Sequence, residues 1–247
     1  MDRLIYTAMT GASHTLQQQA AVAQNLANVN TPGFRSTIDT FRSVPLVGEG
    51  LPTRAFVVDS TSGTDFTPGV IQGTGRELDV AIDGTGWLAV QDANGNEAYT
   101  RNGGLKVTPE GILQTNSGLN VMGDSGPITI PPDTQVTISK DGTVSTVPSQ
   151  SQAAQVVVVG RLKLVNPPED QLVRGEDALF RTKDGNPADA DANVTVVSGS
   201  LEGSNTNMVE SMVNMITLAR QFDTQMKMLQ MADENAKSAS SVLSVTG

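Results

Sequence analysis

The chain has 247 residues, one histidine, no cysteine and a net charge of −10 at pH 7. This acidic balance argues against nucleic-acid binding, because phosphate neutralisation needs clustered Lys and Arg. The lack of cysteine excludes disulfides, iron–sulfur clusters and thiol catalysis, and one histidine excludes multi-histidine metal sites. No apolar run approaches the ~18 residues of a membrane span, and glutamines interrupt every signal-like apolar stretch near the start. We therefore expect no membrane insertion, no metal and no cofactor, in a protein that is cytoplasmic or exported without a cleaved signal peptide.

Glycine and proline divide the chain into three parts. All 12 prolines and 22 of the 24 glycines lie between Pro32 and Gly203. Because these residues interrupt helices, the distribution predicts a mixed, mainly β body, sandwich-like or barrel-like, flanked by N- and C-terminal α-helices. We expect the terminal helices within residues 1–34 and 204–247, an extended connector over 35–75 and an outer β-rich domain over 76–203.

The first breaker-free end predicts a helix with a coiled-coil seam. Residues recur on one line at alternating steps of four and three, which is the heptad repeat of a coiled coil. Two alanines and a glutamine make this seam light, so the helix is expected to be weak alone in water. It should end before Pro32, because proline disfavours helix in the residue that precedes it. The seam residues are Ile5, Met9, Ala12, Leu16, Gln19, Ala23 and Leu26.

The second breaker-free end carries a stronger seam with the same spacing. Ser204 or Asn205 is expected to cap the helix start. Six of the nine methionines lie between Met208 and Met231, and methionine suits surfaces that meet several different neighbours. The alternative is an ordinary amphipathic helix packed on its own domain. The seam residues are Met208, Met212, Met215, Ala219, Phe222, Met226 and Leu229.

The middle of the chain predicts many short strands and no catalytic site. Alternating apolar residues from Leu78 to Ile82 are followed by closely spaced turn signals, a pattern typical of all-β domains. The Gly84-Thr85-Gly86 sequence does not open a helix, so it is interpreted as a hairpin turn and not as a dinucleotide-binding motif. His14 and Ser13 are adjacent on a helix and cannot face each other. Without a paired set of reactive groups, we expect no catalytic residues and no enzyme.

Three motifs resemble the signatures of the bacterial flagellar axial proteins, the rod and hook family. The first runs from Leu26 to Arg35, the second joins Leu78–Trp87 to Tyr99–Gly103, and the third runs from Leu201 to Glu210. They stand in the order typical of that family and span nearly the whole chain. The motif residues singled out are Leu26, Ala27, Asn28, Thr31, Gly33, Phe34, Tyr99, Arg101, Gly103, Glu202, Gly203, Ser204 and Asn205.

This resemblance implies a structural subunit of the flagellar basal-body rod. It implies export through the flagellar type III apparatus, assembly in the periplasmic space, and pairing of the terminal helices into the inner part of a helical assembly. The implied partners are copies of the chain and other rod subunits. The opening Met1–Tyr6 and the short length favour a proximal rod subunit; a distal rod or hook-related subunit and a soluble ligand-binding β domain are the alternatives. Phe222 is then predicted to contact only neighbouring subunits.

Overall fold

The computed structural model describes residues 4–45, 55–148 and 156–245. These residues form two compact units, and each is described separately. Unit 1 comprises Met1–Val29, Ser36–Asp65 and Thr206–Gly247, within the described ranges, and unit 2 comprises Asn30–Arg35 and Phe66–Asn205. The expectation of a mainly β chain with one helix near each end is confirmed.

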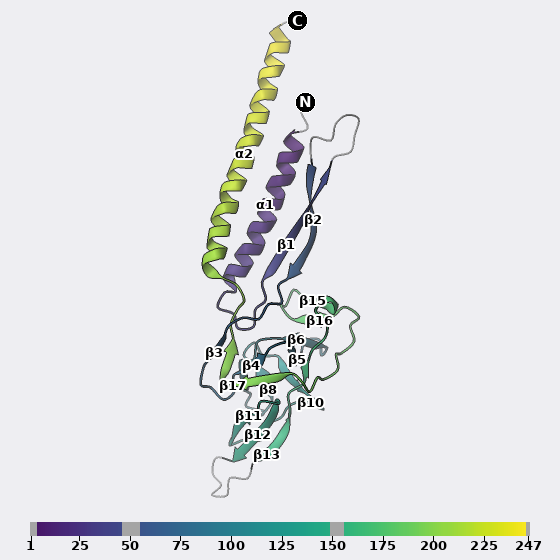
Figure 1. Cartoon of the computed structure of the whole chain (residues 1–247), viewed down its shortest axis with the longest axis vertical. Coiled ribbons are helices and arrows are strands. Elements are labelled where there is room, and N and C mark those ends of the chain that lie inside the picture. Colours follow the sequence, from purple (N-terminus) through teal and green to yellow (C-terminus); the bar gives the residue numbers. More distant parts are fainter. Residues whose placement is uncertain (1–3, 46–54, 149–155, 246–247) are drawn as a thin grey trace. The chain divides into compact units, whose positions relative to one another are not determined.

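Unit 1 contains both helices. Helices α1 (Leu4–Ala27) and α2 (Met208–Val245) run antiparallel and side by side (Figure 1). Helix α1 ends before Pro32, as expected. Asn207 caps α2, because its Oδ1 accepts hydrogen bonds from the backbone N–H groups of Val209 and Glu210. The expectation that Ser204 or Asn205 is the cap is therefore wrong.

A long β-hairpin completes unit 1. Strands β1 (Thr37–Pro45) and β2 (Ala55–Thr64) pair antiparallel with a bulge between Thr40 and Phe41. The hairpin occupies the segment that the sequence predicts as an extended connector. Polar residues are mixed with β-branched ones in both strands, which leaves no clear alternation to mark them. Pairing and contact with α1 stabilise these strands instead, and the ring of His14 meets the ring of Phe41 edge-on at 5.5 Å.

Unit 2 is built from short strands in several sheets. The largest sheet has the order β15-β16-β6-β5-β9-β8-β7, with β10 and β14 attached to it; β11-β12-β13, β17-β4 and β18-β3 form smaller sheets. This sheet ends in two edge strands, so within the described residues it does not close, which corrects the barrel-like alternative. The strands are β3 (Ile71–Gly73), β4 (Val80–Asp83), β5 (Trp87–Gln91), β6 (Glu97–Thr100), β7 (Leu105–Val107), β8 (Leu113–Thr115), β9 (Asn120–Gly123), β10 (Gly126–Pro127), β11 (Thr134–Ile138), β12 (Thr143–Pro148), β13 (Val157–Arg161), β14 (Leu164–Val165), β15 (Leu172–Arg174), β16 (Phe180–Thr182), β17 (Thr195–Ser198) and β18 (Ser200–Glu202), with a short 3-10 turn at Glu169–Gln171.

Two apolar clusters hold unit 2 together. The larger cluster includes Val90, Leu113 and Val121, which are fully buried. The smaller cluster surrounds Trp87, whose ring lies 4.5 Å from that of Phe180. This second cluster also contains Tyr99, one of the motif residues.

Candidate functional site

Burial on α1 follows one line of the helix and leaves its neighbouring line open. Of the predicted seam, Ala12 is buried, and Ile5, Gln19 and Leu26 are half-buried. Met9 is 55% exposed and Leu16 49% exposed, and Ala23 is exposed as well. The positions just before these three, occupied by Ala8, Thr15 and Val22, are buried or half-buried instead.

Helix α2 repeats this arrangement. Met215, Ala219, Phe222 and Leu229 are half-buried, whereas Met208, Met212 and Met226 are exposed. We call the buried and half-buried residues along one side of each helix its inner line. The inner line of α2 faces α1, because Thr15 Oγ1 donates a 3.3 Å hydrogen bond to Gln225 Oε1 and Gly11 lies against the same side chain. Phe222 lies on this inner line, three residues before Gln225. Because Phe222 is half-buried in the single chain, we expect it to contact α1 as well, and not only neighbouring subunits as the sequence predicts.

The exposed residues of the two predicted seams, together with Ile216, lie on the same face of the pair, whereas other exposed apolar residues such as Tyr6, Val213 and Met228 lie on other sides of the helices. Apart from Met208 at the start of α2, each residue on this shared face follows a buried or half-buried residue by one position, as Met9 follows Ala8 and Met212 follows Ser211. One residue corresponds to a rotation of about 100° in the same sense along each helix. Because α1 and α2 are antiparallel, equal rotations from their contact line lead to the same side. We call this surface the open helix face; it consists of Met9, Leu16, Ala23, Met208, Met212, Ile216 and Met226.

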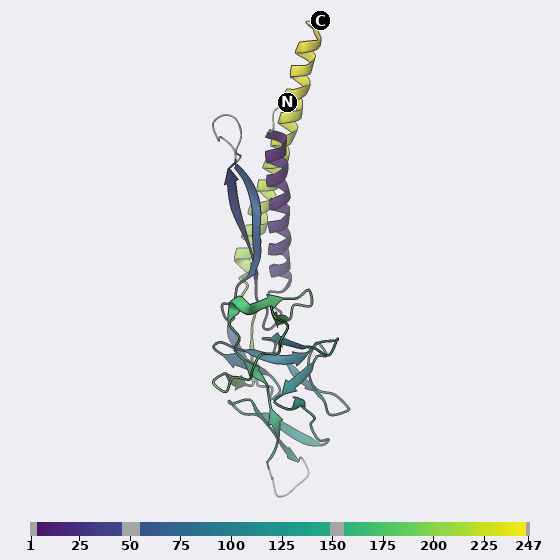
Figure 2. The ribbon, with the colours of Figure 1, turned by 90° about the vertical axis from the view of Figure 1, so that its right-hand side faces the viewer.

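The β1–β2 hairpin covers the opposite side of α1 (Figure 2). It contacts α1 through His14 and through Asn25, whose Oδ1 and Nδ2 both pair with the backbone of Thr37 at 2.9 Å. On the helix these two residues lie on the opposite flank from Met9 and Leu16. The hairpin therefore leaves the open helix face uncovered. Ile216 belongs to this face, but its position outside the strict four-three spacing kept it from being predicted.

Helix α2 extends beyond its partner. The contacts of Gln225 with Gly11 and Thr15 set the register, and counting along both helices puts Leu4 near residues 232–236. The following turns of α2, up to Val245, continue past the first described residue of α1 (Figure 1). This end of α2 has no α1 surface beside it within the described residues.

One charged residue from each of the three family motifs takes part in a buried ion cluster inside unit 2. Glu202, at the end of β18, forms ion pairs with Arg35 at 2.7 Å and with Arg101 at 3.0 Å. The three side chains are 1%, 0% and 4% exposed. Burial lowers the pKa of Arg101, and the charge of Glu202 opposes that shift. Both guanidinium groups also lie near the ring of Trp87, at 5.9 Å for Arg35 and 5.4 Å for Arg101.

Two further motif residues serve the packing of unit 2. Tyr99 is buried, and its hydroxyl accepts a 2.7 Å hydrogen bond from the backbone N–H of Ala188. Burial raises the pKa of Tyr99 to about 12, and the neighbouring charge of Glu97 adds to that shift. A Cβ at Gly103 would lie 1.8 Å from the carbonyl oxygen of Val80, so only glycine fits there. Arg35 and Trp87 were not among the predicted site residues, because their roles depend on contacts distant in sequence.

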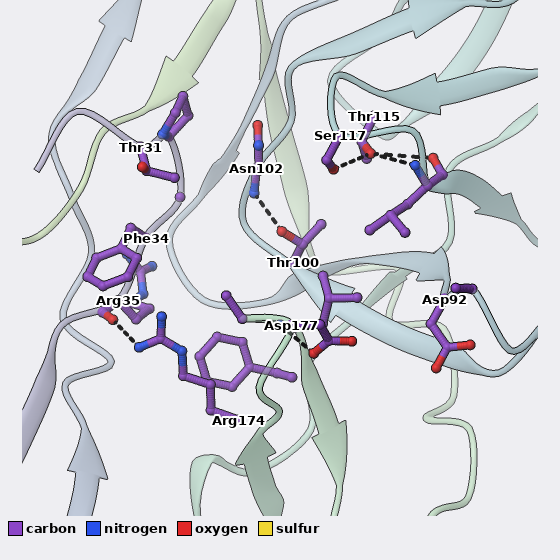
Figure 3. A pocket seen from close by; sticks show the side chains of 17 residues that line it. Thr31, Phe34, Arg35, Asp92, Thr100, Asn102, Thr115, Ser117, Arg174 and Asp177 are labelled. Carbon is purple, nitrogen blue, oxygen red and sulfur yellow. Dashed lines mark hydrogen bonds between the residues drawn. The ribbon is translucent and has the colours of Figure 1, made fainter. Parts of the chain in front are cut away.

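The remaining motif residues lie beside this cluster or at the end of α1. Thr31, Gly33 and Phe34 line a hollow of about 340 Å³ in unit 2 (Figure 3). Gly203 continues from Glu202 into the backbone beside β3, and its N–H donates to the Val70 carbonyl at 2.9 Å. Leu26 and Ala27 close α1, Asn28 donates to the Gln24 carbonyl, and Ser204 and Asn205 precede α2.

The charged side chains that line the hollow are paired with other groups. At one edge Arg174 donates to the Arg35 carbonyl at 2.9 Å, and its guanidinium lies 4.6 Å from the centre of the Phe34 ring (Figure 3). Its two carboxylates, Asp92 and Asp177, both pair with Arg181. Over the described part of the chain, no group of three His, Cys, Asp or Glu side chains could hold a metal ion. No helix among these residues is long and apolar enough to span a membrane.

Comparison with known proteins identifies the family. Residues 5–35 match the family model "Flagella basal body rod protein", residues 81–146 match the "Flagellar hook protein FlgE/F/G D1 domain", and residues 197–242 match the "Flagellar basal body rod FlgEFG protein C-terminal". Flagellar basal-body rod protein FlgF of Escherichia coli (strain K12) is 48% identical over 252 aligned residues, which cover 100% of both chains. FlgF of Salmonella typhimurium is 46% identical over the same extent, and FlgG of Bacillus subtilis (strain 168) is 30% identical over 95% of this chain and 96% of its own. These relatives are structural rod proteins and not enzymes, which agrees with the expectation from sequence. The chain therefore belongs to the FlgF family of flagellar basal-body rod proteins, within the rod and hook family that its three motifs indicate.

Proposed function

We propose that this chain, a structural subunit of the proximal rod of the flagellar basal body, polymerises through its terminal helices. The polymer is the shaft that transmits torque from motor to hook. The assembly domain comprises residues 1–34 and 204–247, and residues 76–203 form the outer domain. The observation that carries this proposal is the open helix face, in which large apolar side chains of both helices stand uncovered on one side of the pair.

The physical basis of assembly is burial of this face between subunits. Exposed apolar patches of this kind mark interaction surfaces, and each buried methylene stabilises a contact by about 0.8 kcal/mol. Contacts between different surfaces of successive subunits do not close on themselves, so they produce an open helical filament. In this arrangement the heptad seams of α1 and α2 form coiled-coil contacts within and between subunits. The inner line holds the pair together, and the open helix face holds neighbours.

The composition fits export and assembly outside the cytoplasm. A chain with no cysteine forms no disulfides on reaching an oxidising compartment, and a light helix seam unfolds readily for passage through the type III export apparatus. The partners are copies of the chain and the other proximal and distal rod subunits, in the periplasmic space. The alternative is a distal rod or hook-related subunit. The chain is 30% identical to the rod protein FlgG of Bacillus subtilis, which is lower than its 48% identity to FlgF of Escherichia coli.

Cysteine labelling tests the assembly surface directly. The chain has no cysteine of its own, so Met9→Cys and Met212→Cys each introduce a single reactive thiol. Both thiols should react rapidly with a maleimide in the free chain and become protected in purified basal bodies. Rapid labelling of both positions in assembled basal bodies would show that the open helix face is not an interface. Locating the labelled subunit along the rod by electron microscopy separates a proximal from a distal position.

A further inference from the structure

The chain crosses between its two units at four places. At each crossing one end of the connecting backbone lies in unit 2, and these four ends meet around one residue. The passages lie between Val29 and Asn30, between Arg35 and Ser36, between Asp65 and Phe66, and between Asn205 and Thr206. The unit 2 residues at these crossings lie in three segments: residues 30–35, 66–70 and 201–205. These segments are far apart in sequence, so only tertiary contacts can hold them together.

Glu202 contacts all three segments. Its backbone carbonyl accepts a 2.8 Å hydrogen bond from the N–H of Gly33, and its Oε1 accepts a 2.8 Å bond from the N–H of Gly69. The same carboxylate forms the ion pair with Arg35. Glu202 itself lies in the third segment. One buried residue therefore joins the segments by one ion pair and by two hydrogen bonds that it accepts from backbone N–H groups, one at its carbonyl and one at its carboxylate.

Neighbouring contacts reinforce this junction. Asn205 N–H donates to the Phe34 carbonyl at 3.3 Å, and Asn205 Nδ2 donates to the Thr67 carbonyl at 3.2 Å. Arg101 connects the junction to the main sheet, because Nη1 pairs with Glu202 and Nη2 donates to the Gly84 carbonyl at 2.7 Å. The segments are thus fixed to each other and to the body of unit 2.

Glycine is required where the segments cross. A Cβ at Gly33, whose φ is +69°, would lie 2.3 Å from the Arg101 carbonyl carbon. A Cβ at Gly69 would lie 2.1 Å from the Gly203 carbonyl oxygen. The backbones approach each other as closely as glycine permits, which is a geometry that tolerates little relative movement.

The ion cluster depends on the carboxylate of Glu202. No other acidic group among the described residues forms an ion pair with Arg35, and its Nε and Nη1 atoms make no hydrogen bond there. Breaking a buried ion pair by removing one partner is strongly destabilising, because the other charge remains buried and uncompensated. Neutralising Glu202 would leave two buried guanidinium groups facing each other.

We propose that Glu202 is a positioning residue that clamps the unit 2 ends of all four passages into one rigid point. Glu202, Arg35, Arg101, Gly33 and Gly69 form this clamp. The proposal rests on the proposed function, since a rod subunit must transmit torque along its own chain. Torque that passes through the backbone between the units then enters unit 2 at a single fixed junction and not at separate, independently moving strands.

Hydrogen exchange in the free chain tests the clamp. In Glu202→Gln, the amides of Gly33 and Gly69 should exchange faster by about tenfold or more, while those of the core strands β5 and β9 change far less. Leu113→Ala is the matched control, because it removes a buried side chain of the large core cluster without touching the clamp. It should accelerate all unit 2 amides together. The proposal is overturned if Glu202→Gln also accelerates all amides equally, or leaves Gly33 and Gly69 unchanged.

The single tryptophan gives an independent readout. Because Trp87 lies beside both arginines, acrylamide should quench its fluorescence several-fold more strongly in Glu202→Gln than in Leu113→Ala. If Glu202→Gln does not fold, Glu202→Asp replaces it in the exchange measurement. It keeps the charge but cannot reach all its partners, so it should give intermediate exchange at Gly33 and Gly69. Wild-type exchange at both glycines in Glu202→Asp would contradict the clamp.

A bead assay on rotating flagella then measures the mechanical role. Rods containing Glu202→Gln should rotate normally under low load and fail under high load, whereas rods containing Leu113→Ala should sustain both. Equal torque in the two variants would refute the role of the clamp in transmission. If the wild-type chain does not enter rods at all, the proposed function fails, whereas the exchange and quenching results still decide whether the clamp exists.

Discussion

The substitution Met212→Glu separates contacts within one chain from contacts between chains. Met212 is 46% exposed on the open helix face, so in the free chain a glutamate at this position stays in water. A surface change of this kind alters the free energy of unfolding by no more than about 0.5 kcal/mol. In an assembled interface the same carboxylate is buried without a partner.

The expected cost to assembly follows from two contributions. Assembly can bury only the exposed 46% of Met212, so losing the methionine removes about 0.7–1.4 kcal/mol, and desolvating an unpaired carboxylate adds at least ~2 kcal/mol. A total of about 3 kcal/mol corresponds to a loss of about two orders of magnitude in the association constant of each contact. Urea unfolding of the purified chain should therefore match wild type, while cells carrying the variant should lose rods and motility.

Two companion variants make this result decisive. Phe222→Glu changes the inner line, so it should lower the free energy of unfolding of unit 1 by about 2 kcal/mol, roughly half the cost of removing a fully buried phenylalanine. Asn214→Glu adds the same charge to an exposed position on the other flank of α2, and should leave both stability and motility unchanged. Motile cells with Met212→Glu, or a clearly destabilised free chain, would refute the assignment of the open helix face.

Three further predictions concern unit 2 and the helix pair. Gly33→Ala should unfold or strongly destabilise unit 2, because its Cβ would overlap the backbone of Arg101. Gly118→Ala, with a φ of +90° and no atom within 4 Å of its Cβ, should cost only about 1 kcal/mol of backbone strain. Equal urea midpoints for the two variants would contradict the close approach of Gly33 to Arg101. The pKa of Tyr99 is raised from 10 to about 12, so the unfolded chain loses its proton first. The free energy of unfolding should therefore fall by about 2 kcal/mol as the pH rises from 10 to 12. Tyr99→Phe should remove this alkaline loss, which urea titrations at both pH values measure. A chain that ends at Asn205 should keep the buried Trp87 and its emission spectrum but fail to restore motility, and an exposed Trp87 in that chain would show that unit 2 needs α2 to fold.

The positions of the helices could be predicted from the sequence, but the face that each residue occupies could not. The distribution of glycine and proline marks both helices, and the heptad spacing places the seam to within one residue. Choosing between Met9 and Ala8, or between Met212 and Ser211, requires knowing which surface meets the partner helix. Large apolar residues suggest the wrong line at these positions, since the inner contact uses the small ones.

The hairpin and the clamp lay beyond sequence reasoning for different reasons. Strands β1 and β2 carry mixed polar and apolar residues, so no alternation in the sequence marks them as strands. Much of their stability comes from pairing and from contact with α1, which the sequence does not show. The clamp depends on Arg35 and Glu202, which are 167 positions apart. Local patterns identify the motifs that contain them, but not that the two charges meet in a buried cluster.

Small residues occupy the most buried positions of the inner line, and large apolar residues occupy the open helix face. This division gives the helix pair one set of contacts within the chain and another for neighbouring subunits. The most buried positions of the inner line are Ala8, Ala12, Thr15 and Ser211, which bring the helices close but bury little apolar surface. Since hydrophobic stabilisation grows with buried area, at roughly 25 cal/mol per Å², the pair is weakly held by these contacts. The large apolar side chains of the open helix face, Met9, Leu16, Met212, Ile216 and Met226, remain for contacts with neighbours. If the open helix face is the assembly surface that we propose, burial of these side chains adds to the free energy that holds the helix pair together only once neighbours are in contact.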